Sequence, residues 1–184
     1  MAKEPTPVDR AFERCKLLAQ VVALEYRRAR ANPLDDRYAT LGITERGELK
    51  ADAVHQIEEA FSDLEALVNH LTILDMAAAF EKMFNARIAT AVGEARKTLR
   101  GKHRGPVLAG RDGIVREMED FRGLSNITNL IGADLDEQVK KRIESVRENR
   151  NRFAHGTDLT TPPTIPREEA RDALNEAVIL LKPM

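Results

Sequence analysis

A short basic segment near the C-terminus contains the residues best suited to chemistry. Its sequence is Arg150-Asn151-Arg152-Phe153-Ala154-His155-Gly156. On a continuous helix Asn151 and His155 lie on one face with Arg147, and the long side chain of Arg150 borders that face. An imidazole can move a proton to or from a ribose 2′-hydroxyl, and a guanidinium can hold the phosphate while charge builds on its oxygens. The set therefore suits RNA cleavage by transesterification, a reaction that requires no metal ion.

The same segment has a second interpretation as an ordinary helix end. Basic residues in a last helical turn oppose the helix dipole favourably, and glycine is the usual residue after a helix. Arg150, Arg152, His155 and Gly156 fit that description too. Spacing alone leaves both interpretations open.

The elements that must position this segment are all predicted to be helices. Apolar residues at steps of three and four predict a first helix from Pro7 to about Ala31, followed by a connection over residues 32–48 that contains one short turn. From Leu49 the pattern continues to about Leu99, as one very long helix or two nearly collinear ones. Within it, residues 71–84 are mostly apolar on every side, which predicts the centre of the bundle.

The second half of the chain predicts three more helices. One spans Asp112 to about Ile131, and the next opens at Asp134 with a capping-box pattern and runs to the Ala154–Gly156 region. Its inward side is marked by Val139, Ile143, Val146 and Arg150. The last helix begins at Pro166. The predicted fold is therefore all-α, an up-and-down helical bundle.

Composition bounds the class of protein. At 184 residues with 42% hydrophobic and 32% charged residues, the chain is globular and long enough for one domain. A formal net charge of −1 neither supports nor excludes RNA, so any polyanion must meet a local patch. The single Cys15 cannot form an internal disulfide and is interpreted as a core thiol rather than a reactive one. No apolar run is long enough for a membrane span, which predicts a cytoplasmic protein.

The motif resembles the Arg-x4–6-His signature of the HEPN superfamily, in its Arg-Asn-x-x-x-His form. Ala154-His155-Gly156 is similar to the Ala-His-Gly ending of many members, and the placement before a loop and a final helix matches. The resemblance covers roughly Leu64 to Lys182. It implies an N-terminal helical extension and connection over residues 1–50 and a HEPN-like bundle over residues 51–184.

The resemblance also implies a function. HEPN ribonucleases are metal-independent, often toxins or antiviral-defence effectors, and act as homodimers in which two motifs form one cleft. By this resemblance Arg150 and His155 are the catalytic pair and Asn151 orients or supports the site. The superfamily also contains noncatalytic members, so a helical scaffold or a nucleotide- or partner-binding module is the alternative. The amphipathic helix at Pro7–Ala31 favours that alternative slightly.

Weaker features complete the predicted site. Asp75 and Glu81 lie in or beside the apolar stretch, where an unpaired carboxylate is costly to bury, so one is expected to pair with a motif arginine. We expect Glu81 to be the carboxylate that supports the site, with Arg147 as a second supporting residue. An exposed position or an ordinary ion pair is the alternative for Glu81.

Further basic residues are candidates for RNA binding. These are Arg152 and, in the basic loop of residues 96–104, Lys102 and Arg104. A solvated loop explains the latter two equally well. His55, His70 and His103 lack metal-ligand spacing, so we expect surface or packing roles, no metal and no cofactor.

The last prediction concerns assembly. In-line cleavage needs one proton removed and another delivered, so two histidines divide the work better than the single His155 of one chain. A twofold axis beside the motif would bring both copies of the pair to one phosphate. Between Lys140 and Arg152, six basic residues against two acidic ones predict an excess of four positive charges around that phosphate. We therefore expect RNA and a second copy of the chain as binding partners, and the resemblance to HEPN toxins and defence effectors implies an antitoxin or defence partner as well.

Overall fold

The computed structural model describes residues 4–45, 49–100, 123–156 and 161–180, which form helices and the connections between them, with no strand among them. The predicted all-α class is confirmed. In chain order the helices are α1 (Pro7–Ala31), α2 (Asp36–Thr40), α3 (Lys50–Arg100), α5 (Leu124–Ile131), the short 3-10 helix η1 (Gly132–Asp134), α6 (Glu137–Ala154) and α7 (Arg167–Leu180).

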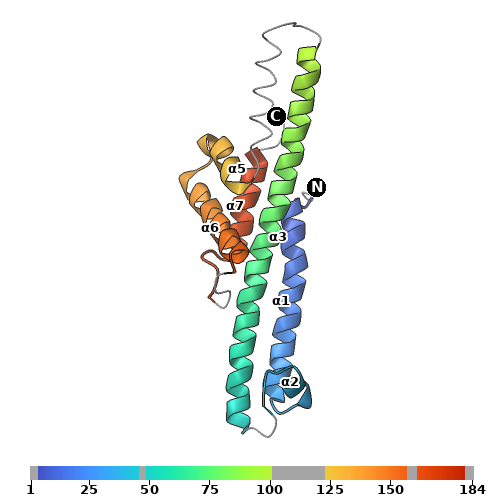
Figure 1. Ribbon diagram of the computed structural model, residues 1–184, viewed down its shortest axis with the longest axis vertical. Coiled ribbons are helices and arrows are strands. Elements are labelled where there is room, and N and C mark those ends of the chain that lie inside the picture. The colour runs from blue at the N-terminus through green and yellow to red at the C-terminus, as the bar shows by residue number, and fades with distance from the viewer. Residues whose placement is uncertain (1–3, 46–48, 101–122, 157–160, 181–184) are drawn as a thin grey trace.

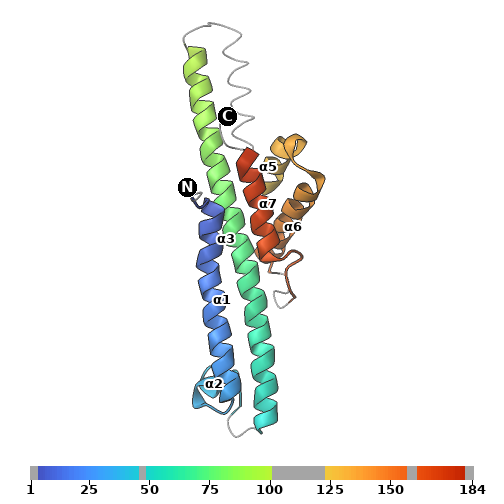
Figure 2. The ribbon, with the colours of Figure 1, turned by 180° about the vertical axis from the view of Figure 1, so that it is seen from behind.

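Helix α3 is the central helix, which α1, α5, α6 and α7 all contact. It is one continuous helix of 51 residues, about 75 Å long at the usual rise per residue, so the first of the two predicted alternatives is correct. Helix α1 runs antiparallel to the first half of α3 on one side, while α5 and α6 lie on the other side of its middle, and α7 contacts both α3 and α1 (Figure 1). Seen from behind, α6 and α1 again flank α3 on opposite sides (Figure 2). The motif helix α6 is thus held by α3 and α7, with which it makes most of its contacts.

Local sequence explains where the first helix begins. Thr6 caps α1 by accepting a hydrogen bond from the Asp9 backbone N–H at 3.0 Å, and the Asp9 carboxylate accepts in return from the Thr6 N–H at 3.0 Å. This reciprocal pair is a capping box, and Pro7 at the first helical position needs no hydrogen-bond partner for its nitrogen. The predicted bounds of α1 match the structure.

The predicted start of α6 is wrong by two residues. Asp134 lies in η1, and the N-cap is Asp136, whose carboxylate accepts from the Gln138 N–H at 2.7 Å. Leu135 between them has an extended backbone and is buried in the core. Burying Leu135 requires a break in the helix before Asp136, a tertiary demand that the capping pattern does not reveal.

The helix predicted over Asp112 to Ile131 is described only from Leu124 onward as α5, and its earlier part lies outside the described residues. The predicted connection after Ala31 contains one short helix, α2. No helix among the described residues is long and apolar enough to cross a membrane.

The core has two parts. The main cluster surrounds Ile73, Met76, Phe80 and Phe84 of α3 and takes side chains from α1, α5, α6 and α7. A smaller cluster, built on Ala29, Tyr38, Ile57 and Phe61, lies where α1, α2 and α3 meet. The antiparallel pair of α1 and the first half of α3, together with α2, is here called the hairpin.

The prediction that residues 71–84 are covered on every side is only partly right. Ile73, Met76 and Phe80 are fully buried, but Ala78 is exposed and Asp75 is half-buried. Helices α6 and α7 cover one side of this stretch and α1 covers part of another, and Asp75 and Ala78 lie beside a groove between α1 and α3. Cys15 is half-buried with its Sγ 4.0 Å from Asp75 Oδ2, so it lies at the α1–α3 contact rather than in the core.

Candidate functional site

The motif lies at the C-terminal end of α6. Val139, Ile143 and Val146 bury the inner face of this helix against the core. The helix ends at Ala154 and His155 is its C-cap, with the His155 N–H donating to the Asn151 carbonyl at 3.0 Å. The imidazole is therefore attached to a helix end that α3 and α7 hold in place.

Gly156 closes the helix in the left-handed conformation. Its φ is +63°, a region that side-chain-bearing residues rarely adopt, and its N–H donates to the Phe153 carbonyl at 3.2 Å. The ordinary helix-end interpretation of the sequence is thus structurally correct for Gly156. It does not exclude a role for His155, because both the His155 and the Asn151 side chains are exposed to solvent.

Arg150 is held by an acidic residue from another helix. Its Nη2 lies 3.3 Å from Glu81 Oε2 of α3, and the side chains are 38% and 14% exposed, respectively. An arginine of the motif and Glu81 therefore do form an ion pair. Since a guanidinium has five N–H donors, Arg150 has donors beyond this contact to offer to an anion.

Glu81 also joins a third helix to the site. Its Oε1 accepts from the Leu124 N–H at 2.9 Å, at the first turn of α5, where the N-cap residue Gly123 has no side chain to do so. A carboxylate at a helix N-terminus is stabilised by the helix dipole. Glu81 thus links α3, α5 and α6 around Arg150.

Asp75, the other carboxylate considered, does not reach the motif. Its Oδ2 lies 2.8 Å from Arg14 Nη2 of α1, on the opposite side of α3 from α6. This ion pair tethers α1 to α3 instead.

Arg147 has a partner on its own helix. Its Nε donates to Glu144 Oε2 at 2.8 Å, and its Nη2 contacts the other carboxylate oxygen. This hydrogen bonding lowers the pKa of the Glu144 carboxyl and raises the pKa of Arg147, outweighing the opposite effect of burial on each. The arginine of the motif helix that Glu81 contacts is therefore Arg150, while Arg147 is bonded to Glu144.

The predicted excess of positive charge is reduced by such pairs. Four of the six basic residues lie within 4.0 Å of an acidic side chain: Lys140 with Glu137, Arg142 with Glu169, Arg147 with Glu144, and Arg150 with Glu81. Three of these acids lie outside the span that the sequence argument counted. The local field is therefore weaker than that argument predicted.

The most buried polar residue of α6, Asn149, was not predicted from the sequence. Asn149 is 2% exposed, and its amide donates to the Thr164 hydroxyl while its carbonyl accepts from the Thr164 N–H, each at 3.2 Å. The inward position assigned to Arg150 belongs to Asn149. A signal was available, because Asn149 follows Ile143 and Val146 at the same spacing of three.

His70 holds the same loop from α3. It is 2% exposed, and its Nε2 lies 2.8 Å from the Thr161 carbonyl, which can only accept, so Nε2 donates. The other ring nitrogen has no hydrogen-bond partner among the described residues. The prediction of a packing role is confirmed for His70, and a surface position for His55. The segment from Thr161 to α7 is therefore fixed from both α3 and α6.

Three predicted RNA-binding residues remain. Arg152 is half-buried in the last turn of α6. Lys102 and Arg104 lie outside the described residues, as does His103.

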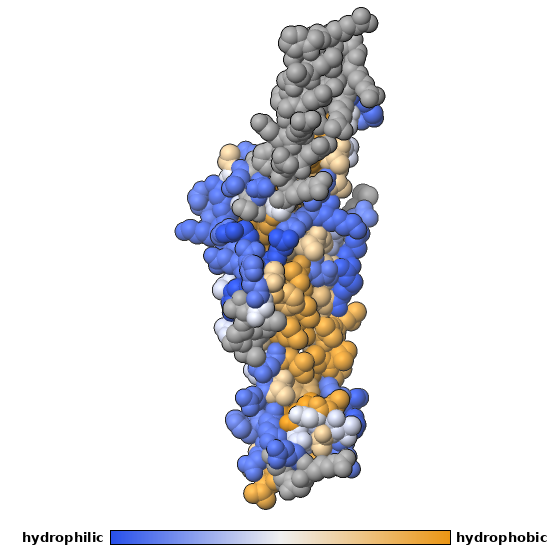
Figure 3. All heavy atoms as spheres, in the orientation of Figure 1, coloured by the Kyte–Doolittle hydropathy of each residue, from blue (hydrophilic) through white to orange (hydrophobic). Residues whose placement is uncertain are grey.

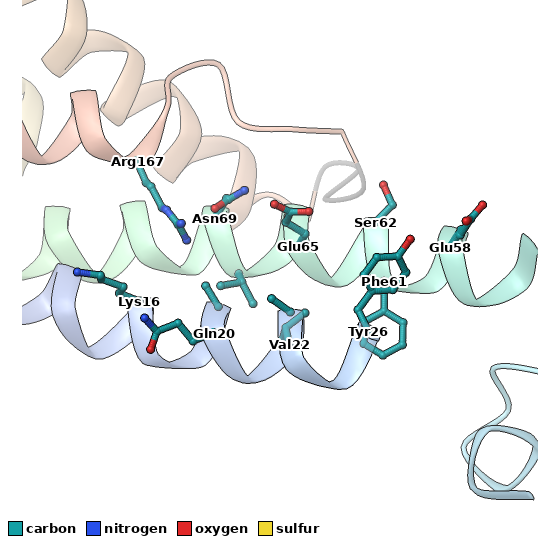
Figure 4. Close-up of a pocket in the computed structure, with 13 residues that line it drawn as sticks. Lys16, Gln20, Val22, Tyr26, Glu58, Phe61, Ser62, Glu65, Asn69 and Arg167 are labelled. Atoms are coloured by element: carbon teal, nitrogen blue, oxygen red, sulfur yellow. The ribbon is translucent and has the colours of Figure 1, made fainter. Parts of the chain in front are cut away.

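A groove of about 480 Å³ lies between α1 and α3, away from the motif. Figure 4 shows Tyr26 and Phe61 side by side in this groove, and their ring centroids are 5.5 Å apart. Its rim carries charges of both signs, including Lys16, Glu65 and Arg167. Mixed charge does not favour a polyanion, so this groove is a poor candidate for binding RNA.

No cluster of three or more histidine, cysteine or acidic side chains with metal-binding geometry occurs in the described part of the chain. Comparison with models of known protein families, with curated proteins and with solved structures finds no match to this chain.

Proposed function

We propose that this chain is a metal-independent endoribonuclease of the HEPN type, a toxin or defence effector. One observation carries the proposal: the exposed His155 and Asn151 share the last turn of α6 with Arg150, which Glu81 holds from a neighbouring helix. A proton-transfer group, an amide and a positioned cation thus occupy one rigid helix end.

Each residue has a defined part in the proposed reaction. The ribose 2′-oxygen attacks the adjacent phosphorus, the bond to the 5′-oxygen breaks, and a 2′,3′-cyclic phosphate and a 5′-hydroxyl form. His155 transfers a proton to or from the reacting oxygens, and Arg150 stabilises the charge on the phosphate oxygens. Asn151 orients these groups. Glu81 is a positioning residue, because it acts through Arg150.

The reaction needs two proton transfers, and we propose that the second histidine comes from a second copy of the chain. A twofold axis beside the exposed end of α6 would place two copies of the motif at one phosphate. The ion pairs at Lys140, Arg142 and Arg147 support this arrangement, because they lower the repulsion between the two basic helices.

Purified protein incubated with mixed RNA in EDTA tests the catalytic proposal. We expect cleavage that leaves cyclic phosphate ends and that falls about 100-fold or more in His155→Ala and in Arg150→Ala. His55→Ala, which removes an exposed histidine of α3 far along the chain from the motif, is the matched control and should cleave like the parent. No cleavage, or equal cleavage by His155→Ala, contradicts the proposal.

Sedimentation at low and high salt, with and without a short RNA, tests the paired motif. RNA should raise the number of protein copies per complex above its value without RNA for the parent protein and not for Arg150→Ala, and high salt should weaken RNA binding. A parent protein that cleaves RNA while RNA leaves this number unchanged would contradict the two-histidine arrangement.

A second candidate function has its own supporting observation. Helix α1 exposes a row of large apolar side chains, as an interaction module would. Growth arrest on expression separates the two functions, because a ribonuclease toxin arrests cells in a manner that depends on His155 and a noncatalytic module does not.

A further inference from the structure

Helix α1 has two apolar faces, of which only one is covered. The covered face packs Val8, Ala11 and Phe12 into the main core. On the other side, Leu17, Leu18, Val21 and Leu24 are 65%, 44%, 61% and 56% exposed. A helix that is apolar on both faces normally has neighbours on both.

These four side chains are here called the α1 patch. Single exposed leucines are ordinary on protein surfaces, but four large apolar residues within eight positions make a contiguous area. Figure 3 shows apolar residues gathered over the middle of α1 and α3, bordered by polar ones. Such an area, rimmed by charge, is typical of a protein interface.

We propose that the α1 patch binds the α1 patch of a second copy of this chain, with the two helices antiparallel. The patch is symmetric about the point between Gln20 and Val21: Leu17 and Leu24 each lie about 5 Å from it along the helix. A twofold axis through that point sets Leu17 level with the partner's Leu24, and Val21 next to the axis. An isologous contact requires a surface of this kind, one that is complementary to itself.

The charges at the two ends of the patch determine the direction. Glu13 and Lys16 form an ion pair of 3.3 Å before it, and Glu25 and Arg28 one of 3.4 Å after it. In the antiparallel arrangement Glu13 lies level with the partner's Arg28, and Lys16 with the partner's Glu25. A parallel arrangement would instead set like charges level with each other, which is unfavourable.

One pair of like charges remains in the antiparallel arrangement. Arg14 lies level with the partner's Arg27, but Asp75 of α3 already binds Arg14 at 2.8 Å and offsets its charge. The balance of charge therefore still favours the antiparallel direction.

The rest of the molecule leaves room for this contact. Helix α6, which carries the motif, lies on the other side of α3 from α1, and α7 meets α1 at Asp9 and Phe12 rather than at the patch, so the motif lies away from the proposed interface (Figure 1). Two hairpins paired through α1 make a four-helix arrangement, a common way to bury such faces. The inference is independent of the ribonuclease proposal and concerns a different surface from the paired motif.

Sedimentation equilibrium of the full chain without RNA tests the interface. We expect a dimer at micromolar concentration, and at least a 100-fold weaker association for Leu17→Glu combined with Leu24→Glu, which sets carboxylates against each other. Leu34→Glu combined with Leu41→Glu is the matched control: both leucines are more than half exposed but lie outside the patch, near α2, so this variant should dimerise normally. A parent that is monomeric up to 100 μM, or a patch variant that dimerises like the control, overturns the proposal.

Crosslinking with a short bismaleimide tests the direction, in a Cys15→Ser background that contains no other thiol. Val21→Cys should crosslink to itself and Leu34→Cys should not. An equal mixture of Glu13→Cys and Arg28→Cys should yield a mixed dimer, while Glu13→Cys alone should yield little. Efficient crosslinking of Glu13→Cys to itself, without the mixed product, would show a parallel pair and overturn the antiparallel arrangement.

Discussion

The bundle around the motif and the hairpin differ in which side chains they bury and which they expose. Around the motif, buried and half-buried polar side chains bind partners on other elements: Asn149 binds Thr164, His70 binds Thr161 through Nε2, and Glu81 binds Arg150. In the hairpin, leucines on α1 face solvent. Buried polar contacts cost free energy unless they are satisfied, so their density near the motif shows where the fold requires a defined geometry. Exposed apolar area instead marks the surface at which we propose that a second copy binds.

The largest expected difference between the two regions concerns their aromatic cores. Phe80 is fully buried in the main cluster, whereas Phe61 is 7% exposed and lines the groove between α1 and α3. We expect Phe80→Ala to lower the free energy of unfolding by about 3–5 kcal/mol and Phe61→Ala by less than about 3 kcal/mol, because Phe61 belongs to the smaller cluster and borders a groove into which neighbouring side chains can relax. Urea denaturation measures both. Equal losses would show that the hairpin is covered as completely as the bundle.

The next effect separates two asparagines of α6 that lie two residues apart. Asn149→Ala removes both hydrogen bonds to Thr164 and should lower the free energy of unfolding by roughly 1–3 kcal/mol. The exposed Asn151→Ala should stay within about 0.5 kcal/mol of the parent while reducing RNA cleavage. Thermal denaturation and the cleavage assay, run on both variants, provide the four values. If Asn151→Ala is the more destabilising substitution, the assignment of one structural and one functional asparagine is wrong.

A smaller effect on stability is expected for the carboxylate behind the motif. Glu81→Gln keeps an oxygen that can accept from the Leu124 N–H but loses the charge that holds Arg150. Because Arg150 is 38% exposed and solvent screens the pair, we expect a loss of about 1 kcal/mol or less. Cleavage should fall further than that change explains, with a higher KM for RNA if Arg150 is misplaced. Asp75→Asn, which breaks the ion pair to Arg14 instead, should leave cleavage unchanged.

The smallest effect concerns the junction of hairpin and bundle, where Asp9 of α1 accepts from the Asn175 amide of α7 at 2.8 Å. Partial burial acts to raise the pKa of the Asp9 carboxyl, but hydrogen bonds from Thr6 and Asn175 and the charge of Arg171 together lower it below its ordinary value of 3.8. A folded-state pKa below the unfolded one contributes stability above the unfolded value, and that stability is lost as pH falls through the folded value.

Asp9→Asn should therefore be less stable than the parent at neutral pH, and the difference should shrink as the pH falls from about 6 to about 2. Denaturation at a series of pH values measures this difference. Asp63→Asn, which changes an exposed aspartate on α3, is the control. A difference that is constant over this range would show that the carboxyl contributes through its shape and not its charge.

Much of the fold follows from local sequence. The bounds of α1, the continuity of α3, the end of α6 at Ala154 and the start of α7 near Pro166 agree with periodicity, capping residues and glycine placement. These signals act within a few residues, through hydrogen bonds and backbone conformations that neighbours in the chain determine. A helix likewise sets the relation of Asn151 to His155 without help from the rest of the molecule. That spacing alone left the helix-end interpretation open, and the resemblance of the motif was needed to assign a catalytic role to Arg150 and His155.

Tertiary structure decided which residues of distant helices meet. Glu81 meets Leu124 across 43 positions of the chain, and Thr6 meets Asn175 across 169. Such contacts depend on how helices pack. The sequence pattern of α3 therefore indicated that Glu81 needs a partner, but it could not show that the Leu124 N–H binds the same carboxylate. The same reason explains why the α1 patch was missed. Residues 17–24 are apolar on nearly every side, and only the position of α3 decides which side is covered and which side is left for a partner.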